Sequence, residues 1–197
     1  MALQNQHTPG ILEAGLDEAG RGCLAGPVVA AAVILPEDFF HPVLNDSKQL
    51  SHKQRLELRD VILEQAIDWA IGIYSHAQID QVNILKASHL AMHQAVDALN
   101  VKPEALLVDG NRFIQHVIPH TCMVKGDARF RNIAAASILA KTYRDDIMEM
   151  LHQEHPQYGW LQNKGYPTEV HRLAVAEFGL SPYHRRSFNS SIQLQLF

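Results

Sequence analysis

The chain has 197 residues, of which 47% are hydrophobic and 19% charged, and its formal net charge is −4 at pH 7. This composition excludes an intrinsically disordered chain and argues against nucleic-acid binding through net charge alone. The sequence contains neither eighteen consecutive apolar residues nor a basic and then apolar leader, so we expect a cytoplasmic protein without membrane association. Cys23 and Cys122 lack a paired spacing and the histidines are scattered, so neither disulfides nor structural zinc is expected.

An acidic pair beside a glycine-rich turn is the first feature that suggests chemistry. An apolar run at 11–14 predicts a strand, which leads to Asp17, Glu18 and the turn Gly20-Arg21-Gly22. Because side chains alternate along a strand, both acids reach one site only if the chain leaves its regular path there. We expect Asp17 to offer its carboxylate to a metal ion, and Glu18 to offer either its side chain or its main-chain carbonyl. A solvated turn is the common alternative for such a pair.

The rest of the chain predicts strands first and helices later. A wholly apolar run at 28–35 indicates a strand covered on both faces, which excludes a dinucleotide-binding loop at the glycines because such a loop opens a helix. Ser51 and Gln54 form a capping-box pattern, and Thr168 is the expected N-cap of the last helix. Further strands are predicted at 67–74, 105–109 and around 122–124, and helices at 51–66, 84–99, 133–151 and 168–178. This order predicts an α/β sheet with a helical C-terminal part.

Two of the later predicted strands also lead to carboxylates. Asp109 ends the apolar run at 105–108, and Asp127 follows Gly126 after the strand near 122. Oxygen ligands from separate strands suit Mg²⁺ or Mn²⁺. Two such ions about 4 Å apart can activate a water molecule and neutralise the leaving oxygen in phosphodiester cleavage. The pattern therefore indicates a metal-dependent site.

Seven segments together are similar to a known family. They are Asp-Glu-Ala-Gly-Arg-Gly at 17–22, Asn-Asp-Ser-Lys-Gln-Leu at 45–50, Val-Asp-Gly at 108–110, Lys-Gly-Asp at 125–127, Ala-Ala-Ala-Ser-Ile-Leu-Ala-Lys at 134–141, Asn-Lys-Gly-Tyr-Pro-Thr at 163–168 and Ser-Pro-Tyr-His-Arg-Arg-Ser-Phe at 181–188. In this order they resemble ribonuclease HII over residues 15–188. The related ribonuclease HIII carries an extra N-terminal domain, for which we expect no room in this chain.

The resemblance implies a ribonuclease H-like mixed sheet flanked by helices, in a single domain of residues 1–190 whose helical part lies at about 150–190. It also implies an endonuclease that hydrolyses the RNA strand of RNA–DNA hybrids and incises 5′ of single ribonucleotides embedded in duplex DNA, leaving 5′-phosphate and 3′-hydroxyl ends. Such an enzyme serves ribonucleotide removal in DNA replication and repair. By position, Asp17, Glu18, Asp109 and Asp127 would hold Mn²⁺ or Mg²⁺, with two ions once substrate is bound, and would act in catalysis.

The resemblance further implies how substrate is read. The Gly20-Arg21-Gly22 turn would contact the 2′-hydroxyl through backbone groups, which fits physically because glycine lets a main chain approach closely. Tyr166 would pack on the sugar after the scissile phosphate, and an ordinary core or surface tyrosine is the alternative. Arg21 is equally consistent with a surface ion pair. The other candidate substrate contacts are Lys48, Ser137, Lys141, Lys164 and Arg185, although an isolated cation is usually solvated surface.

The C-terminal tail, residues 191–197, suggests a partner. Gln193-Leu194-Gln195-Leu196-Phe197 is similar to the short peptide with which bacterial replication and repair proteins bind the sliding clamp. Its apolar side chains are costly to leave exposed, so the alternative is packing on its own domain. Apart from the clamp, the expected partners are the hybrid and the ribonucleotide-containing duplex, and we expect a monomer.

Two rival functions remain open at this point. A module that binds RNA–DNA hybrids without cutting them would favour lysines over the four carboxylates. Another nuclease or an integrase of the same fold would share the acids at the strand ends, but it would leave the Gly20-Arg21-Gly22 turn unexplained.

Overall fold

A computed structural model describes residues 3–44 and 50–188 of the chain. Its elements, in chain order, are β1 (Glu13–Ala19), β2 (Val28–Ile34), α1 (His52–Gln65), β3 (Asp68–Tyr74), α2 (His76–Val82), α3 (Ile84–Asp97), β4 (Ala105–Asp109), β5 (His120–Met123), η2 (Gly126–Ala128), α4 (Arg131–Glu154), η3 (Pro156–Tyr158), α5 (Trp160–Asn163) and α6 (Glu169–Phe178). This mixture of strands and helices confirms the predicted α/β class.

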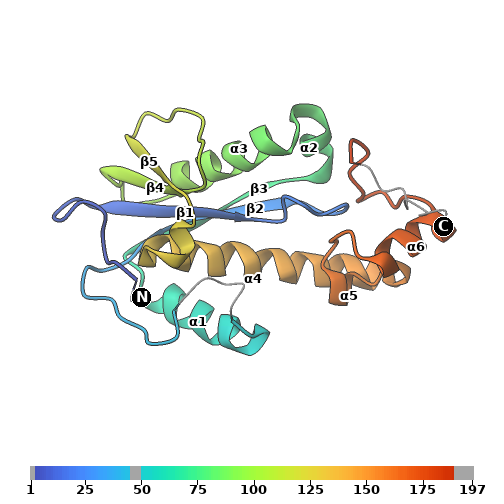
Figure 1. Ribbon diagram of the computed structural model, residues 1–197, viewed down its shortest axis with the longest axis horizontal. Coiled ribbons are helices and arrows are strands. Elements are labelled where there is room, and N and C mark those ends of the chain that lie inside the picture. Colours follow the sequence, from blue (N-terminus) through green and yellow to red (C-terminus); the bar gives the residue numbers. More distant parts are fainter. Residues whose placement is uncertain (1–2, 45–49, 189–197) are drawn as a thin grey trace, which may run out of the picture.

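The strands form one mixed five-stranded sheet in the order β3-β2-β1-β4-β5. β1 and β2, and β2 and β3, pair antiparallel, whereas β1 pairs parallel with β4 and β4 pairs parallel with β5. Every residue of β2 is buried, as its unbroken apolar run predicts. β1 is therefore an inner strand whose carboxyl end lies beside the carboxyl end of β4 (Figure 1).

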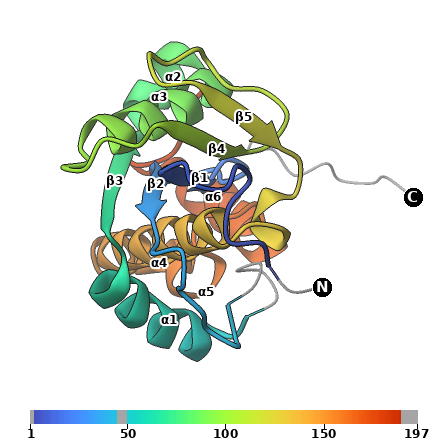
Figure 2. The same ribbon diagram turned by 90° about the vertical axis from the view of Figure 1, so that its left-hand side faces the viewer.

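Helices cover both faces of the sheet. Figure 2 shows α4 and α1 on one face and α2 and α3 on the other. The backbone of α4 comes so close to β1 that a Cβ atom on Gly15 would lie 2.2 Å from the carbonyl carbon of Asn132. Only glycine permits this approach. As a result, the side chains of α4 lie directly against the strand that carries the acidic pair.

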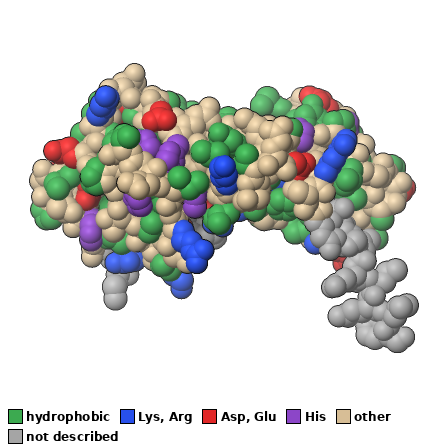
Figure 3. Space-filling model, turned by 90° about the horizontal axis from the view of Figure 1, so that it is seen from above, with side chains coloured by type: hydrophobic (Ala, Val, Ile, Leu, Met, Phe, Trp, Pro, Cys, Tyr) green, Lys and Arg blue, Asp and Glu red, His purple; other side chains and the backbone are tan. Residues whose placement is uncertain are grey.

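The C-terminal helices form a smaller lobe at the far end of α4. Its core contains Met148 of α4, Tyr158, Trp160 and Ala174, all buried. Figure 3 shows two lobes of unequal size with a narrower middle, and α4 runs through both of them (Figure 1). None of the described helices combines the length and the apolar character that a membrane crossing requires.

Most of the predicted elements are confirmed, with shifts at their ends. The Ser51 capping box and the Thr168 N-cap are both present. The short helix α2 was not predicted, although Ser75 opens it with a second capping box. The helical spacing of Ala136, Ala140, Tyr143, Ile147 and Met150 predicts an apolar stripe along α4, and this prediction is wrong at Met150, which is exposed.

Candidate active site

The strand register brings three acidic side chains to one edge of the sheet. Leu16 of β1 is paired with Val108 of β4, so the next residues along the two parallel strands are Asp17 and Asp109. Glu18 follows Asp17 in β1. The carboxyl ends of neighbouring parallel strands are where open α/β sheets place their sites. This juxtaposition is the one that the sequence predicts.

The expected break in the chain at the acidic pair is wrong. β1 pairs continuously with β2 from Gly15 to Ala19, so Asp17 and Glu18 point to opposite faces of a regular strand. Asp17 is hydrogen-bonded to Ser137 of α4, and Glu18 lines a second, smaller cavity with residues of α3. Both nevertheless line one cavity, together with the residues that follow them, Ala19 to Gly22.

That cavity has a volume of about 270 Å³ and lies between the sheet, α1 and α4. It brings together most of the residues that the sequence singled out. They are Asp17, Glu18, Gly20, Arg21, Gly22, Asp109, Ser137, Lys141 and Tyr166, joined by Ala19 and Arg55. Sequence reasoning missed Arg55, which the helical pattern of α1 shows only as a polar position.

Asp17 is electrostatically strained in this cavity. Burial raises its pKa well above the usual value, and the neighbouring charges of Glu18 and Asp109 raise it further. Hydrogen bonds from the Ser137 hydroxyl and from the Glu18 backbone N–H, the latter 2.7 Å from Oδ1, act in the opposite direction. Three carboxylates that repel one another around a cavity are suited to a cation, which removes the repulsion.

Asp127 lies near this group without lining the cavity. It is buried in η2, the turn after β5, where Lys125 has a positive φ of 55°. The N–H of its neighbour Gly126 donates to Asp109 Oδ1 at 2.7 Å. Asp127 therefore comes directly after Gly126, whose N–H contacts Asp109. It lies one turn past the end of β5, the strand end at which the sequence places it.

Two buried arginines hold the backbone of the glycine turn and of the residues after it through hydrogen bonds to carbonyl oxygens. Arg185 donates to the carbonyl oxygens of Gly20, Arg21, Gly26 and Pro27 at 2.7 to 3.1 Å. The sequence analysis gives Arg185 as a candidate substrate contact. Because Arg185 is only 1% exposed, it supports the turn and does not present its guanidinium to a phosphate.

Arg144 of α4 completes this support. It donates to the carbonyls of Ala25, Pro27 and Lys164, and so joins the turn to the segment before Tyr166. The sequence analysis missed this residue, because a charge in the second half of a long helix normally indicates solvent exposure.

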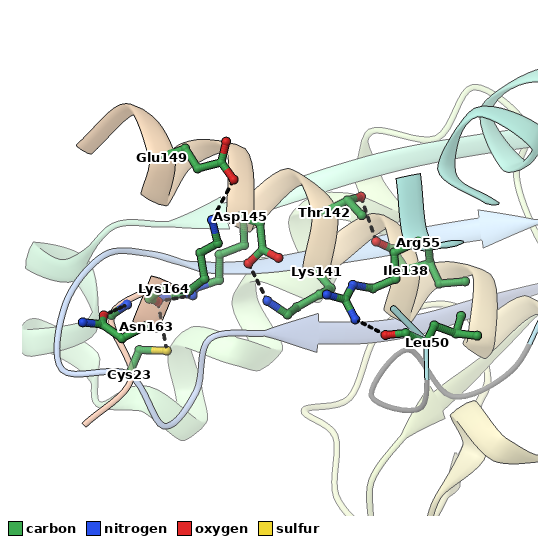
Figure 4. A network of polar contacts seen from close by, with 12 residues as sticks. Cys23, Leu50, Arg55, Ile138, Lys141, Thr142, Asp145, Glu149, Asn163 and Lys164 are labelled. Carbon is green, nitrogen blue, oxygen red and sulfur yellow. Dashed lines mark hydrogen bonds and ion pairs between the residues drawn. The ribbon is translucent and has the colours of Figure 1, made fainter. Parts of the chain in front are cut away.

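The remaining predicted contacts are distributed as follows. Three of them form ion pairs: Arg21 with Glu18 at 3.1 Å, Lys141 with Asp145, and Lys164 with Glu149 at 2.7 Å, the last two of which Figure 4 shows. Lys48 and the 191–197 tail lie outside the described residues.

Two buried histidines tie the Tyr166 loop to the C-terminal lobe. His171 Nε2 lies 3.0 Å from Trp160 Nε1 and 3.1 Å from His184 Nε2, and its Nδ1 lies 2.9 Å from the Tyr166 carbonyl. The Ser181 N–H donates to His184 Nδ1 at 2.9 Å. Since the indole can only donate, these partners assign the protons to His171 Nδ1 and His184 Nε2. The network is complete when both rings are neutral.

Acid should therefore loosen this lobe. Burial, followed by the neighbouring histidines, lowers the pKa of His184 from 6.5 to about 4. Between these values the unfolded chain binds more protons, so stability is lost as the pH falls below about 6.5. We expect urea unfolding of His184→Asn to show a weaker loss of stability between pH 7 and pH 5 than the unmodified protein. Equal losses in the two proteins would contradict this role.

Comparisons with known proteins agree with the geometry. The family model for ribonuclease HII matches residues 14–191. The chain belongs to the ribonuclease HII family. As a member of that family, it is an endoribonuclease of the ribonuclease H class, which acts on RNA–DNA hybrids with divalent metal ions.

Individual relatives are similar over nearly their whole length. Ribonuclease HII of Bacteroides thetaiotaomicron is 62% identical over 180 residues, which cover 91% of this chain and 90% of that protein. The crystal structure of ribonuclease H2 from Pyrococcus horikoshii has a TM-score of 0.76 at 26% identity, covering 91% and 94% of the two chains. The ribonuclease HII in a PCNA complex from Archaeoglobus fulgidus has a TM-score of 0.73 at 26% identity, covering 91% and 96%. The ribonuclease H-like fold predicted from the sequence is thereby confirmed.

Proposed function

We propose that this ribonuclease HII, besides acting on hybrids, incises duplex DNA on the 5′ side of a single embedded ribonucleotide. The products carry 5′-phosphate and 3′-hydroxyl ends, and the activity serves ribonucleotide removal in replication and repair. The observation that supports this most is the shared cavity, in which repelling carboxylates lie beside the glycine turn. One group of residues is suited to cutting and the other to recognising a ribose.

The donor set fits Mg²⁺ or Mn²⁺. Asp17, Glu18 and Asp109 offer only oxygen atoms, the ligands that these hard cations prefer. Among the described residues, no three His, Cys, Asp or Glu side chains already enclose an ion position. Magnesium commonly takes one or two carboxylates and completes its shell with water and substrate phosphate oxygens, so this arrangement suits a site completed by substrate.

The four acids share one role in this proposal, and neighbouring groups orient two of them. Asp17, Glu18, Asp109 and Asp127 would hold the metal ions, which would supply activation of the attacking water and stabilisation of the leaving oxygen. The Ser137 hydroxyl orients the Asp17 carboxylate, and the Gly126 N–H orients that of Asp109. These hydrogen bonds keep the oxygens in place before substrate arrives.

The turn supplies the discrimination between ribose and deoxyribose. Arg185 engages the carbonyls of Gly20 and Arg21 from the interior, which fixes the turn at the cavity wall. A rigid backbone at that wall can sense a 2′-hydroxyl, the group that distinguishes RNA from DNA. Tyr166, which is 39% exposed, packs on the deoxyribose that follows the cut.

A substrate panel tests the proposal. The enzyme is incubated with Mg²⁺ or Mn²⁺ and an all-DNA duplex, an RNA–DNA hybrid, or a DNA duplex with one ribonucleotide, and the cut is mapped. Incision 5′ of the lone ribonucleotide is expected. Equal cutting of the all-DNA duplex favours the integrase-like alternative, and tight binding without a cut favours the binding module.

A second proposal concerns the tail. The ribonuclease HII of Archaeoglobus fulgidus, whose fold this chain shares, has a structure in complex with PCNA. We propose that Gln193-Leu194-Gln195-Leu196-Phe197 binds a bacterial sliding clamp. Deletion of residues 191–197 should abolish clamp binding in a titration while leaving cleavage of naked substrate intact, and unchanged clamp affinity would end the proposal.

A further inference from the structure

The residues before β1 lie against the part of the chain that carries Asp127. This N-terminal segment, residues 3–10, belongs to no helix, and in Figures 1 and 2 it runs in dark blue from the start of β1 to the start of α4. It forms an isolated parallel bridge between Gln4 and Phe130. Phe130 is the N-cap of α4 and follows shortly after η2. The N-terminal segment therefore meets the chain at the junction of η2 and α4.

Two main-chain hydrogen bonds hold this junction. The Gln4 N–H donates to the Arg129 carbonyl at 2.7 Å, and the Arg131 N–H donates to the Gln4 carbonyl at 3.0 Å. The first N–H groups of a helix have no partner within the helix, so Gln4 supplies one for α4. The His7 ring adds an edge contact to Phe130, with 5.8 Å between the ring centroids. The N-terminal segment thus fixes the residues on both sides of Phe130.

The same junction supports Asp127. The N–H groups of Arg129 and Phe130 both donate to the Gly126 carbonyl, at 2.9 and 2.8 Å. The Gly126 N–H donates in turn to Asp109 Oδ1 at 2.7 Å. Asp127 lies within this closed turn and is 4% exposed. Because the bonds are continuous, a shift of Arg129 and Phe130 would move Asp127 relative to Asp109.

Glu13 anchors the N-terminal segment from inside the protein. It is the first residue of β1 and is only 2% exposed. Its two carboxylate oxygens accept from the backbone N–H groups of His7 and Thr8, at 2.8 and 2.9 Å. A buried carboxylate needs such compensation, and hydrogen bonds to a charged oxygen are stronger than neutral ones. The N-terminal segment is therefore fastened to the strand that carries the acidic pair.

The backbone of Glu13 is tied to α4 as well. Its carbonyl accepts from Asn132 Nδ2 at 2.7 Å, and Asn132 Oδ1 accepts from the Leu35 N–H at 3.2 Å. Asn132 is 3% exposed and lies one residue after Arg131, which Gln4 contacts. The start of β1, the N-terminal segment and the start of α4 thus form one connected unit.

Asp127 needs a support that the other acids do not. Asp17 and Asp109 belong to β1 and β4, whose pairing sets their separation. Asp127 lies in η2, outside the sheet, so strand pairing does not fix its position. Displacement of a reacting or ligating group by about 1 Å is enough to cost a large factor in rate. The connected unit around Glu13 supplies the missing constraint.

We propose that Glu13 is a positioning residue for hydrolysis, which acts through the N-terminal segment to hold η2 where Asp127 reaches the metal site. Glu13 touches neither the substrate nor a metal ion. This inference rests on the proposed role of Asp127 as a metal ligand. It goes beyond that role by giving the segment before the first strand a part in the reaction.

Cleavage by Glu13→Gln tests the inference. A glutamine offers one acceptor oxygen and turns an amide donor toward the second N–H, so one of the two hydrogen bonds is lost. Hydrolysis of an RNA–DNA hybrid is measured over a range of Mn²⁺ concentrations. We expect kcat to fall about tenfold, as for groups that orient a metal ligand, and the Mn²⁺ concentration for half-maximal rate to rise by a similar factor. The KM for the hybrid should stay unchanged, because no substrate contact is removed.

Hydrogen exchange in the metal-free protein gives a readout that does not depend on activity. The Arg131 N–H is bonded to the Gln4 carbonyl, so in Glu13→Gln it should exchange about tenfold faster. The N–H groups of Arg129 and Phe130 should follow it. The amides of β2 should keep their rates, which distinguishes a loosened junction from global unfolding. Unchanged exchange at Arg131 would overturn the inference whatever the activity.

Glu104 provides a matched control. Its Oε2 accepts from the backbone N–H of Leu12 at 2.9 Å, next to Glu13, but Leu12 lies outside the N-terminal segment. Glu104→Gln should leave kcat, the Mn²⁺ dependence and the exchange at Arg131 unchanged. Equal changes in Glu104→Gln and Glu13→Gln would mean that any loosening near the start of β1 has this effect, and the specific role of Glu13 would be wrong.

A double-mutant cycle with Asp127→Asn separates this inference from the proposed function. If Glu13 acts through Asp127, Glu13→Gln should change the single-turnover rate less than about twofold once Asp127 is replaced. A tenfold loss in both backgrounds would overturn the positioning role and leave the metal role of Asp127 intact. Unchanged activity of Asp127→Asn alone would instead remove the proposed metal role of Asp127.

Discussion

Replacing Asp109 with asparagine should reduce the rate of hybrid and ribonucleotide cleavage about a thousandfold. In this proposal the carboxylate holds a metal ion, and the ion stabilises the charge at the reacting phosphate by several kcal/mol. A change of about 1.4 kcal/mol corresponds to a factor of ten in rate. The asparagine oxygen can still accept the hydrogen bond from Gly126, so the local fold is kept. Single-turnover cleavage with Mn²⁺ measures the loss.

The stability of the same variant provides an independent check. In the metal-free protein, the charge of Asp109 raises the pKa of Asp17, so removing it relieves repulsion. Asp109→Asn should therefore melt at the same temperature as the unmodified protein or higher. Glu64→Gln, on the exposed face of α1, is the control and should keep full activity. Activity within tenfold of normal would show that Asp109 is not a metal ligand.

Adding a methyl group to the two glycines of the turn should have different consequences at each position. A Cβ atom on Gly20 would lie 2.0 Å from Nε of Arg144, and Gly20 has a φ of +98°. Arg144 cannot move aside without releasing the carbonyls of Ala25, Pro27 and Lys164. Gly20→Ala should therefore cost about 1 to 3 kcal/mol of folding free energy, because both the backbone and a buried network are strained.

Gly22 is the matched comparison. A Cβ atom there would meet no atom within 4 Å, so Gly22→Ala should unfold in urea like the unmodified protein. In the proposed function the open space in front of Gly22 is taken by the ribose, so this variant should instead lose cleavage about tenfold to a hundredfold. Equal stability and equal activity for both variants would contradict the assigned roles of the turn.

Much of the sheet could be predicted from local patterns. The unbroken apolar run of β2 predicts a fully buried strand, and Ser51 and Thr168 predict helix starts, because each pattern depends on a few neighbouring residues. α2 was missed because it is short and buries only Ile79. β5 begins at His120, whose polar character does not indicate a strand.

The site was predictable where it depended on strand ends. Asp17 and Asp109 meet because β1 and β4 are parallel neighbours, which the sequence suggests through two apolar runs that end in acids. The roles of Arg144 and Arg185 could not be predicted. Their partners are carbonyl oxygens more than a hundred residues away in the chain for most of the bonds, and no local pattern encodes such contacts.

A calorimetric titration with Mn²⁺ at several pH values tests the central claim, that mutually repelling carboxylates form a cation site. Because burial and the charges of Glu18 and Asp109 raise the pKa of Asp17, the metal must displace a proton at low pH. The account predicts an affinity that rises with pH, with proton release that disappears in Asp17→Asn together with most of the binding. Wild-type affinity in Asp17→Asn, with unchanged pH dependence, would contradict it.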